Sequence, residues 1–484
     1  MKKYLSLIPF AALIALIATC VSVFGTEALE GATQVSLLIA SAVCVLVGYL
    51  MGRVEWELLE REMTDKIASC MPSIIILLLI GAIGSTWMVS GIVPTMIYYG
   101  VQVLRPEWFL ISSSIFCALV SLMVGSSWTT VATIGVALMG IGRAHGFDDG
   151  WVAGSIITGA YFGDKLSPLS DTTVLASSVS GTPLFTHIRY MMKTTIPTFL
   201  ISLLIFTMAG LLMKVSGSGE VSFLHQLKES FMISPWLLLV PVVTGVMIAR
   251  RWPAMVVLFL AAMMAAVVAV VWQPALLSQI AENSWYESIM KVIYGSTQLQ
   301  TGAVDLDQLV HTNGMAGMMP TVWLIICAQV FGGVVTATGV LGDVMQIILH
   351  FVHGTASLVA STALTGIFCN IALSDQFLSI ILTSSMFKDV YRERGYEPRL
   401  LSRTCEDGAT VTSVLVPWNT CGLVQSTVLG VATLAYLPYC FFNFLSPVTS
   451  VIVAASGRVK GGDKANRHRV KGADIHRERV HLLP

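Results

Sequence analysis

Long apolar runs separated by short polar stretches dominate the hydropathy pattern of the chain. A helix needs roughly 20 apolar residues to cross the hydrocarbon core of a bilayer, which is about 30 Å thick. Eight runs approach that length and predict transmembrane helices: 7–24, 33–51, 70–90, 194–213, 232–249, 253–272, 318–338 and 424–446. Five further segments are shorter or broken: 92–104, 108–125, 130–142, 341–352 and 356–372. The pattern predicts an all-α polytopic membrane protein with about 11–13 transmembrane segments.

The composition agrees with a membrane location. Of the 484 residues 55% are hydrophobic and only 12% are charged, whereas about a quarter of an ordinary soluble domain is charged. This composition excludes a soluble enzyme. The 28 Lys and Arg residues balance the 28 Asp and Glu residues, so the net charge indicates no nucleic-acid partner. The nine cysteines are scattered without a C-x-x-C pair, so we interpret them as small hydrophobic residues and expect no cofactor.

The charged loops predict which end of the chain faces the cytoplasm. Lys2 and Lys3 place the N-terminus inside, because cytoplasmic loops carry an excess of basic residues. The run 7–24 is interpreted as the first transmembrane helix, since no cleavage motif of small residues follows it. The orientation of the second half stays open: Arg250 and Arg251 inside with 273–317 outside favour inversion, but then the five basic residues of 388–403 lie outside.

An internal repeat organises the chain. The segment "MPSIIILLLIGAIGSTWMVSG" (71–91) is echoed by "MPTVWLIICAQVFGGVVTATG" (319–339), 248 residues further on. The same offset places Ser126 on Ser374 and Asp171-Thr172 on Asn419-Thr420. Two halves with equivalent interrupted segments are typical of secondary transporters, whose broken helices meet at mid-membrane around the substrate. We therefore expect two repeats, with inversion as the favoured arrangement.

This repeat divides the chain into five predicted parts. The two repeats occupy 70–215 and 318–457, and connecting helices with an extramembrane loop lie between them at 216–317. Residues 1–69 form N-terminal transmembrane helices and an amphipathic linker, and 458–484 form a basic tail that we expect in the cytoplasm.

Four polar clusters interrupt the apolar sequence: "GSSWTT" (125–130), "GDKLSPLSDTT" (163–173), "SDQ" (374–376) and "EDGATVTSVLVPWNTCG" (406–422). Irregular backbone is tolerated at membrane depth only where it is buried in protein or lines a wet cavity. Pro168 and Pro417 help to break the helices there. A broken helix exposes carbonyl oxygens, and neighbouring Ser, Thr and Asn oxygens complete a cage suited to a hard cation such as Na⁺.

Carboxylates and hydroxyls in these clusters are the candidate ion ligands. The first half offers Ser170, Asp171, Thr172 and Thr173, and the second offers Asp375, Gln376, Asn419 and Thr420. Competition of H⁺ and Na⁺ for Asp171 or Asp164 would couple the two ions directly. Lys165 is expected to pair with either aspartate, and charges at such depth favour function.

Structural roles are the competing interpretation of the same residues. Asp171 and Asp375 are also good helix caps, and "SSWTT" also suits close helix packing. Asp164 and Lys165 would alternatively form an ion pair at the membrane interface, where Glu406 and Asp407 are also expected.

The clusters resemble signatures of the NhaC family of Na⁺/H⁺ antiporters. "GAYFGDKLSPLSDTT" with "GTPLFTHIRYM", "GSSWTTVATIGVALMGIGRA" and "MFKDVYRERGYEPRLLSRTCEDGATVTSVLVPWNTCG" carry the resemblance, which runs from roughly residue 70 to 455. It implies inverted repeats, each with a re-entrant hairpin and a broken helix that binds Na⁺. The implied positions are Ser126, Ser127, Ser170, Asp171, Thr172, Ser374, Asp375, Asn419 and Thr420, with Na⁺ held by Asp171, Thr172, Asn419 and Thr420. The chain departs from the family pattern at Thr129, Val174 and Val414.

The sequence thus predicts an inner-membrane antiporter, not an enzyme, that exports Na⁺ for H⁺ by alternating access. Asp171 is the leading candidate for the carrier of both ions, and Asp164, Lys165 and Asp375 are its predicted coupling partners. The main alternative is an exchanger of organic anions (malate or lactate type) or amino acids that is coupled to Na⁺ and H⁺. An intramembrane aspartyl protease is disfavoured because its Gly-x-Gly-Asp is absent, and two clusters favour an occluded site over a channel. The lipid bilayer is the expected partner, and a homodimer is a possible assembly.

Overall fold

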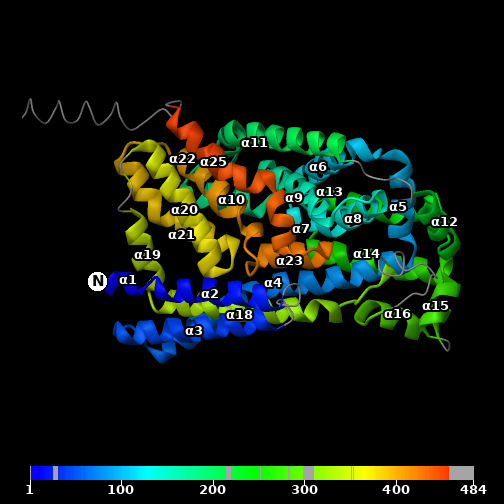
Figure 1. The fold of residues 1–484 in the computed structure, drawn as a ribbon, viewed down its shortest axis with the longest axis horizontal. Helices are drawn as coiled ribbons and strands as arrows, with labels where there is room; N and C mark the ends of the chain where they lie inside the picture. Colours follow the sequence, from blue (N-terminus) through cyan, green and yellow to red (C-terminus); the bar gives the residue numbers. More distant parts are fainter. Residues whose placement is uncertain are drawn as a thin grey trace, which may run out of the picture.

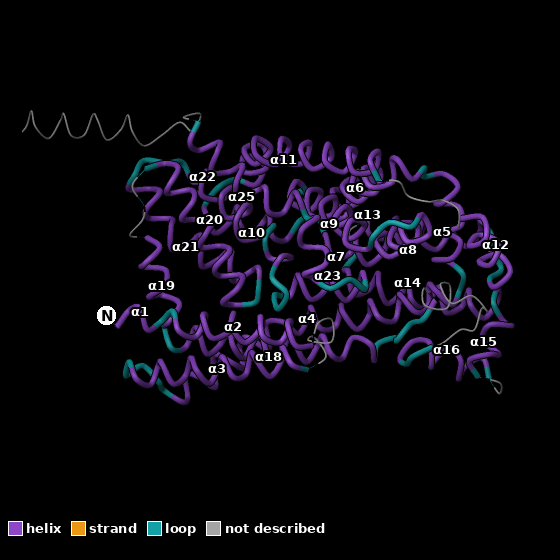
Figure 2. Tube along the Cα trace, in the orientation of Figure 1, coloured by secondary structure: helices purple, strands orange, loops and turns teal. Residues whose placement is uncertain are grey.

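The computed structural model describes residues 2–24, 31–213, 220–250, 252–281, 284–297, 310–349, 352 and 354–456. Within these ranges the chain forms helices joined by short loops, and no strand is drawn there (Figure 2). Among them, seven helices are long and apolar enough to cross a membrane, or up to nine if each of two bent pairs is one span. The predicted all-α polytopic class is confirmed. The predicted tail at 458–484 lies outside the described residues.

The N-terminal helices and the first repeat form a continuous series. The N-terminal helices are α1 (Lys2–Leu5), α2 (Ile8–Phe24) and α3 (Ala32–Leu50). The first repeat comprises α4 (Trp56–Val89), α5 (Ile92–Val103), α6 (Pro106–Val124), α7 (Ser127–Thr130), the π-helix η2 (Val131–Gly135), α8 (Val136–His145), α9 (Asp149–Leu166), α10 (Asp171–Ser180) and α11 (Leu184–Leu212).

Connecting helices lead to the second repeat. They are α12 (Glu220–Ser230), η4 (Pro235–Leu238), α13 (Leu239–Ala249), α14 (Ala254–Trp272), α15 (Pro274–Ile280) and α16 (Trp285–Tyr294). The second repeat comprises η5 (Ala316–Met318), α18 (Met319–Ala337), α19 (Val340–Leu349), α20 (Thr355–Leu373), α21 (Gln376–Glu393), α22 (Pro398–Cys405), the π-helix η6 (Glu406–Thr410), η7 (Ser413–Leu415), α23 (Thr420–Leu429), α24 (Thr433–Tyr436), η8 (Leu437–Tyr439) and α25 (Phe441–Ala455).

Equivalent helices of the two repeats end at opposite ends of the molecule. Helix α4 leads into α5 at one end, whereas α18 leads into α19 at the other (Figure 1). Both turns contain a glycine with a positive φ, Gly91 (82°) after α4 and Gly339 (65°) after α18, as expected for a residue that ends a helix in the left-handed region. The two glycines lie 248 residues apart, so the offset found in the sequence is structural and the repeats are inverted.

The register of the repeats shifts by one residue at the hairpin tips. After α6 the left-handed residue is Gly125 (φ 71°), and after α20 it is Ser374 (φ 58°). The next residues, Ser126 and Asp375, cap α7 and α21. Ser126 is therefore equivalent to Asp375, and the predicted pairing of Ser126 with Ser374 is wrong by one position. The second repeat holds one more residue between the turn at Gly339 and its tip, which an ungapped offset cannot represent.

The same shift applies to the broken helices. Ser170 caps α10 and Asn419 caps α23, each with a side-chain oxygen that accepts a backbone N–H. These two caps lie 249 residues apart, as do Ser126 and Asp375. The sequence pairing of Asp171-Thr172 with Asn419-Thr420 is likewise displaced by one residue.

Close packing of α6 against α9 sets the position of the first break. A Cβ on Gly159 would lie 2.1 Å from the Ser114 carbonyl oxygen, and one on Gly163 would lie 2.2 Å from that of Ala118. The Ser114 hydroxyl donates a 2.6 Å hydrogen bond to the Ser155 carbonyl. Glycines four residues apart let helix backbones approach closely in membranes. Asp164 follows this contact directly, so its backbone is held against α6.

Each repeat also packs against the other near its break. Helix α10 of the first repeat packs on α21 of the second, and α23 of the second packs on α7 and η2 of the first. The four interrupted segments therefore meet in one region, as the sequence predicted for polar clusters that need burial.

Candidate functional site

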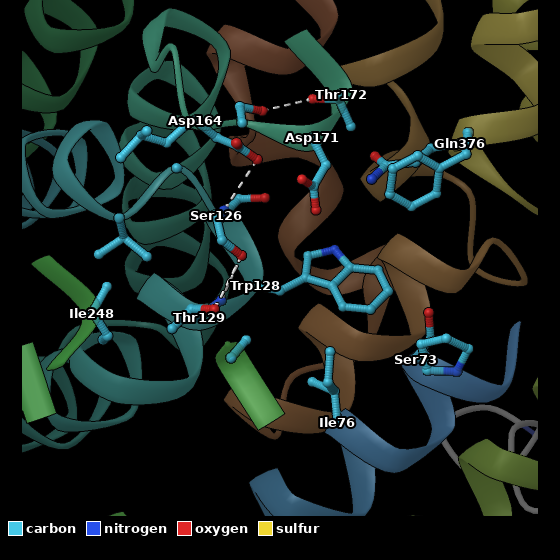
Figure 3. A pocket seen from close by; sticks show the side chains of 18 of the residues that line it. Ser73, Ile76, Ser126, Trp128, Thr129, Asp164, Asp171, Thr172, Ile248 and Gln376 are labelled. Atoms are coloured by element: carbon cyan, nitrogen blue, oxygen red, sulfur yellow. Dashed lines mark hydrogen bonds between the residues drawn. The ribbon is translucent and has the colours of Figure 1, made fainter. Parts of the chain in front are cut away.

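A cavity of about 450 Å³ opens beside the break of the first repeat. In Figure 3, Asp164 and Asp171 approach it from the α9–α10 break, Ser126 and Thr129 from the hairpin tip, and Gln376 from the other repeat. Its predicted ligands are Ser126, Ser127, Asp164, Ser170, Asp171, Thr172 and Gln376. The structure thus brings together most of the first repeat's candidate residues around one space.

Asp164 is the buried carboxylate of this cavity. Only 8% of its surface is exposed. Its Oδ2 accepts a 3.1 Å hydrogen bond from the Ser127 backbone N–H at the start of α7, while Oδ1 has no hydrogen-bond partner among the described residues. A buried carboxylate oxygen without a partner carries a large desolvation cost, and a cation in the cavity would remove that cost.

Asp171 lies at the start of α10 and is exposed. The cap of this helix is Ser170, whose hydroxyl faces the Thr173 N–H at 3.5 Å and the Thr172 hydroxyl at 3.0 Å. The alternative in which Asp171 itself caps the helix is therefore wrong. Its carboxylate and that of Asp164 interact electrostatically as like charges. A cation bound between these two acidic groups would relieve their repulsion.

The hairpin tip contributes hydroxyls and a helix N-terminus. The Ser126 Oγ accepts hydrogen bonds from the Thr129 N–H at 3.2 Å and from the Thr129 hydroxyl at 3.1 Å. Gly125 precedes it, and a Cβ there would lie 2.6 Å from the Cβ of Leu169. The tip therefore touches the α9–α10 break closely, so a displacement of either segment would reshape the cavity.

The second repeat places one predicted ligand in the cavity lining, Gln376. Asp375 instead caps α21 by accepting a 2.9 Å hydrogen bond from the Leu378 N–H, which is the structural role considered as its alternative. Asn419 caps α23 through the Cys421 N–H at 3.0 Å and donates to the Asn370 carbonyl at 3.2 Å. The Thr420 N–H donates to the Ser374 carbonyl at 2.9 Å. Through these contacts the α20–α21 hairpin tip is joined to the start of α23 in the second repeat. Asp375, Asn419 and Thr420 do not belong to the cavity lining.

Lys165 turns away from the cavity. Its ammonium group pairs with Asp407 of η6 instead of with Asp164 or Asp171, and both side chains are fully buried. Consecutive positions on a helix point about 100° apart, so Asp164 and Lys165 face different neighbours. The Thr173 hydroxyl donates to the Lys165 carbonyl at 3.1 Å, which ties α10 to the same end of α9.

Glu406 and Asp407, which we expected at the membrane interface, are buried within the protein. Both are 0% exposed. They lie in η6, which packs against α20 through Gly408: a Cβ there would lie 2.6 Å from the Cα of Ala363. The tertiary packing of α20, α21 and α22 around η6 buries these two carboxylates, and no local sequence pattern signals it.

Several lining residues were missed from the sequence. Ser73 of α4, Trp128 of the tip and Trp252 between α13 and α14 all line the cavity. Ser73 belongs to the "MPS" segment that begins the internal repeat, so the repeat could have pointed to Ser73 as a site residue. Trp252 follows Arg250 in a loop that nothing in the sequence connects to the polar clusters, so only the tertiary structure identifies it.

Two inverted repeats with hairpin tips and broken helices around an acidic cavity define a secondary membrane transporter. The family model of the Na⁺/H⁺ antiporter family matches residues 159–458, more than half of the chain. Curated NhaC proteins align with most of its length. The chain belongs to the NhaC family of Na⁺/H⁺ antiporters, which confirms the resemblance.

Three relatives illustrate the family. The chain is 36% identical over 419 residues to the Na(+)/H(+) antiporter NhaC of Alkalihalophilus pseudofirmus, covering 86% of this chain and 89% of that protein. It is 33% identical to the malate-2H(+)/Na(+)-lactate antiporter of Bacillus subtilis (88% and 89% covered). It is 32% identical to the arginine/ornithine antiporter ArcD of Halobacterium salinarum (93% and 91% covered). The solved structure of Neisseria gonorrhoeae MtrF aligns with a TM-score of 0.36 at 12% identity, covering 83% of this chain and 85% of that one.

Proposed function

We propose that this protein exports Na⁺ in exchange for H⁺ by alternating access across a bacterial inner membrane. The observation that carries the proposal is the pair of carboxylates in the cavity, with the unpartnered Oδ1 of Asp164 beside the exposed Asp171. Hydroxyls of Ser126, Ser127, Ser170 and Thr172 line the same space. Such oxygen ligands suit a hard monovalent cation, and a carboxylate that takes up a proton when the cation leaves couples the two ions. Na⁺ and H⁺ are the substrates, and no cofactor is required.

Two cavities support an alternating mechanism. The ion cavity is lined by Pro72, Ser73 and Ile76 of α4. A second cavity of about 210 Å³ is lined by α4 residues from Ile80 to Met88, and by Arg143 and Gly314. At 1.5 Å per residue along a helix, the two cavities occupy successive levels of α4. Access from one level and then the other is what an inverted-repeat transporter requires.

The distribution of basic residues supports an orientation. The molecular end that carries α1, α19 and the α21–α22 turn holds Lys2, Lys3, Arg53, Lys388, Arg392 and Arg394. The segments at the opposite end, around α5, α12 and α16, carry Arg105, Arg143, Lys228 and Lys291. The end that carries more basic residues is assigned to the cytoplasm by the positive-inside rule. The N-terminus and the tail are therefore assigned to the cytoplasm, and the basic 388–403 segment accompanies them.

Reconstitution tests the proposed exchange. Proteoliposomes with an acidic lumen and a pH-sensitive dye should lose their pH gradient when Na⁺ is added, and Asp164→Asn should lack this response. Malate, lactate, arginine and ornithine are tested in the same vesicles, because two relatives are named for such substrates. Proton flux that requires an organic substrate and ignores Na⁺ alone would replace cation exchange with organic-anion or amino-acid exchange.

A further inference from the structure

A buried cluster of charges lies behind the wall of the ion cavity. It consists of Lys165, Arg403, Glu406 and Asp407, each no more than 1% exposed. Asp164 connects this charge cluster to the cavity, because it precedes Lys165 on α9. The cluster joins α9 of the first repeat to α22 and η6 of the second, so it spans the interface between the repeats.

The partners within the charge cluster are unevenly distributed. Asp407 is fully engaged: it pairs with Lys165, accepts a 3.0 Å hydrogen bond from the Thr194 hydroxyl and has Arg403 Nε 3.8 Å away. Neither carboxylate oxygen of Glu406 has a well-formed hydrogen bond within the described part of the chain, although the Thr410 hydroxyl lies close to it. A fully buried carboxylate without a hydrogen bond is unstable as an anion unless nearby charge compensates it.

Aromatic rings supplement the cations of the cluster. The Arg403 guanidinium lies 5.2 Å from the centroid of the Tyr190 ring, and none of its nitrogens makes a hydrogen bond to the residues that the structure describes. The Lys165 ammonium lies 5.6 Å from the centroid of Phe442. Cation–π contacts stabilise desolvated cations without neutralising them. Both positive charges therefore remain available to the carboxylates.

A count of the buried charges shows an imbalance. Lys165 and Arg403 supply two positive charges, whereas Asp164, Glu406 and Asp407 supply three negative charges when all are ionised. One further cation balances the set, either Na⁺ at Asp164 or H⁺ on a carboxylate. Glu406 interacts electrostatically with Lys165, Asp164 and Asp407. A cation at Asp164 and a proton on Glu406 each neutralise the same excess negative charge, so the binding of one disfavours the binding of the other.

Other titratable groups around η6 do not alter this count. From α10 the titratable residue is Asp171, which is exposed, and α25 carries none. Helix α20 contributes Cys369, α22 contributes Cys405 beside Glu406, and α21 contributes the buried Tyr391, while its charged residues are exposed at its far end: Lys388, Asp389, Arg392 and Glu393. His187 of α11 faces Lys165 and is held by the Ser402 hydroxyl at 2.8 Å. None of these adds a positive charge beside Glu406 that would fix it as an anion.

From these contacts we infer that Glu406 is the proton-carrying residue of the exchanger, at a site separate from the Na⁺ ligands around Asp164. When Na⁺ leaves Asp164, Glu406 takes a proton from water and the buried charge returns to balance. When Na⁺ binds again, Glu406 releases that proton to water on the opposite side of the membrane. The π-helical turn that presents Glu406 is a rare conformation that occurs often at functional sites. The inference rests on the proposed Na⁺/H⁺ exchange and assigns its proton site.

Two transport modes separate this role from a structural one. Proteoliposomes of the full chain are assayed for Na⁺-driven proton flux and for exchange of ²²Na⁺ against Na⁺ at equal pH on both sides. Glu406→Gln should lower the proton flux at least about tenfold, whereas tracer exchange should persist with a raised half-saturating Na⁺ concentration, since neutral Gln mimics the protonated acid that competes with Na⁺. Asp164→Asn should lose both modes. Glu393→Gln, an exposed glutamate in α21, should change neither.

The pH profile provides a second readout. Glu406→Asp should keep Na⁺/H⁺ exchange but displace its pH profile, because the shorter acid sits differently among the same charges. An unchanged profile, or a Glu406→Gln protein with normal proton flux, would overturn the inference, as would equal loss of both modes in a protein that elutes as a folded species. If Glu406→Gln fails to fold, the Glu406→Asp profile decides. A wild-type protein without Na⁺-driven proton flux would instead refute the proposed function itself.

Discussion

The backbone N–H of Ser127 donates a 3.1 Å hydrogen bond to Oδ2 of Asp164, and this contact joins the hairpin tip to the broken helix of the first repeat. It orients the carboxylate so that Oδ1 stays unpartnered at the cavity. In the proposed exchanger, a cation bound at Asp164 would act on the hairpin through this contact.

Asp164→Asn should abolish Na⁺-driven proton flux. The amide keeps the shape but removes the charge, and we expect at least about a tenfold fall in rate, equivalent to about 1.4 kcal/mol. The measurement is dye dequenching in proteoliposomes at saturating Na⁺. Asp389→Asn, whose side chain is 68% exposed in α21, is the control. Equal rates for wild type and Asp164→Asn would contradict the assignment.

Asp171→Asn should weaken Na⁺ binding. Asp171 is exposed at the cavity and acts on a cation together with Asp164, so its loss should raise the half-saturating Na⁺ concentration about threefold to tenfold. The effect should be larger at low ionic strength, where screening is weaker. The Na⁺ dependence of proton flux at two salt concentrations measures it. An unaltered half-saturation would remove Asp171 from the site.

The pair of Lys165 and Asp407 should be strongly coupled in stability. Asp407→Asn removes the carboxylate that is paired with a buried ammonium group, which costs about 3–5 kcal/mol. Lys165→Met in the same chain should recover part of that loss, because it removes the uncompensated charge. Thermal unfolding in detergent of both single variants and the double variant measures the coupling. Additive effects would show that the two side chains do not act as a pair.

Gly159→Ala should destabilise the protein and disturb ion binding. The new methyl group would lie 2.1 Å from the Ser114 carbonyl oxygen, and overpacking of this kind costs about 1–3 kcal/mol. Gly342→Ala in α19 is the matched control, because no described residue lies within 4 Å of its added Cβ. Unfolding midpoints and Na⁺ half-saturation are compared. Identical behaviour of the two variants would contradict the close contact of α6 with α9.

Thiol labelling should reveal the orientation. In a Cys20→Ser background, whose remaining native cysteines are all buried, Trp285→Cys should react with an impermeant reagent in intact cells. Glu393→Cys should react only in inverted membrane vesicles. Both native side chains are exposed and they belong to opposite ends of the molecule, α16 and α21. The reverse pattern would place the N-terminus outside.

The sequence by itself determined the class of fold, the repeat and the location of the helix breaks. Apolar runs of membrane-spanning length can fold in lipid only as helices, because each backbone amide needs an internal hydrogen bond. The sequence repeat that begins at Met71 and Met319 corresponds in the structure to equivalent glycine turns at Gly91 and Gly339. Pro168 lies in the break between α9 and α10, because proline has no backbone N–H to continue a helix.

Only the tertiary structure decided which polar residues meet. Asp164 and Lys165 are neighbours in the chain, yet one faces the cavity and the other pairs with Asp407, 242 residues away. The side chains of Asp375 and Asn419 carry oxygens of the kind that bind cations, but these oxygens accept backbone N–H groups at helix N-termini. Glu406 carries no local signal of burial. Burial and partner choice depend on how α9, α22 and η6 pack against one another, and contacts between segments so distant in the chain leave no periodicity in the sequence.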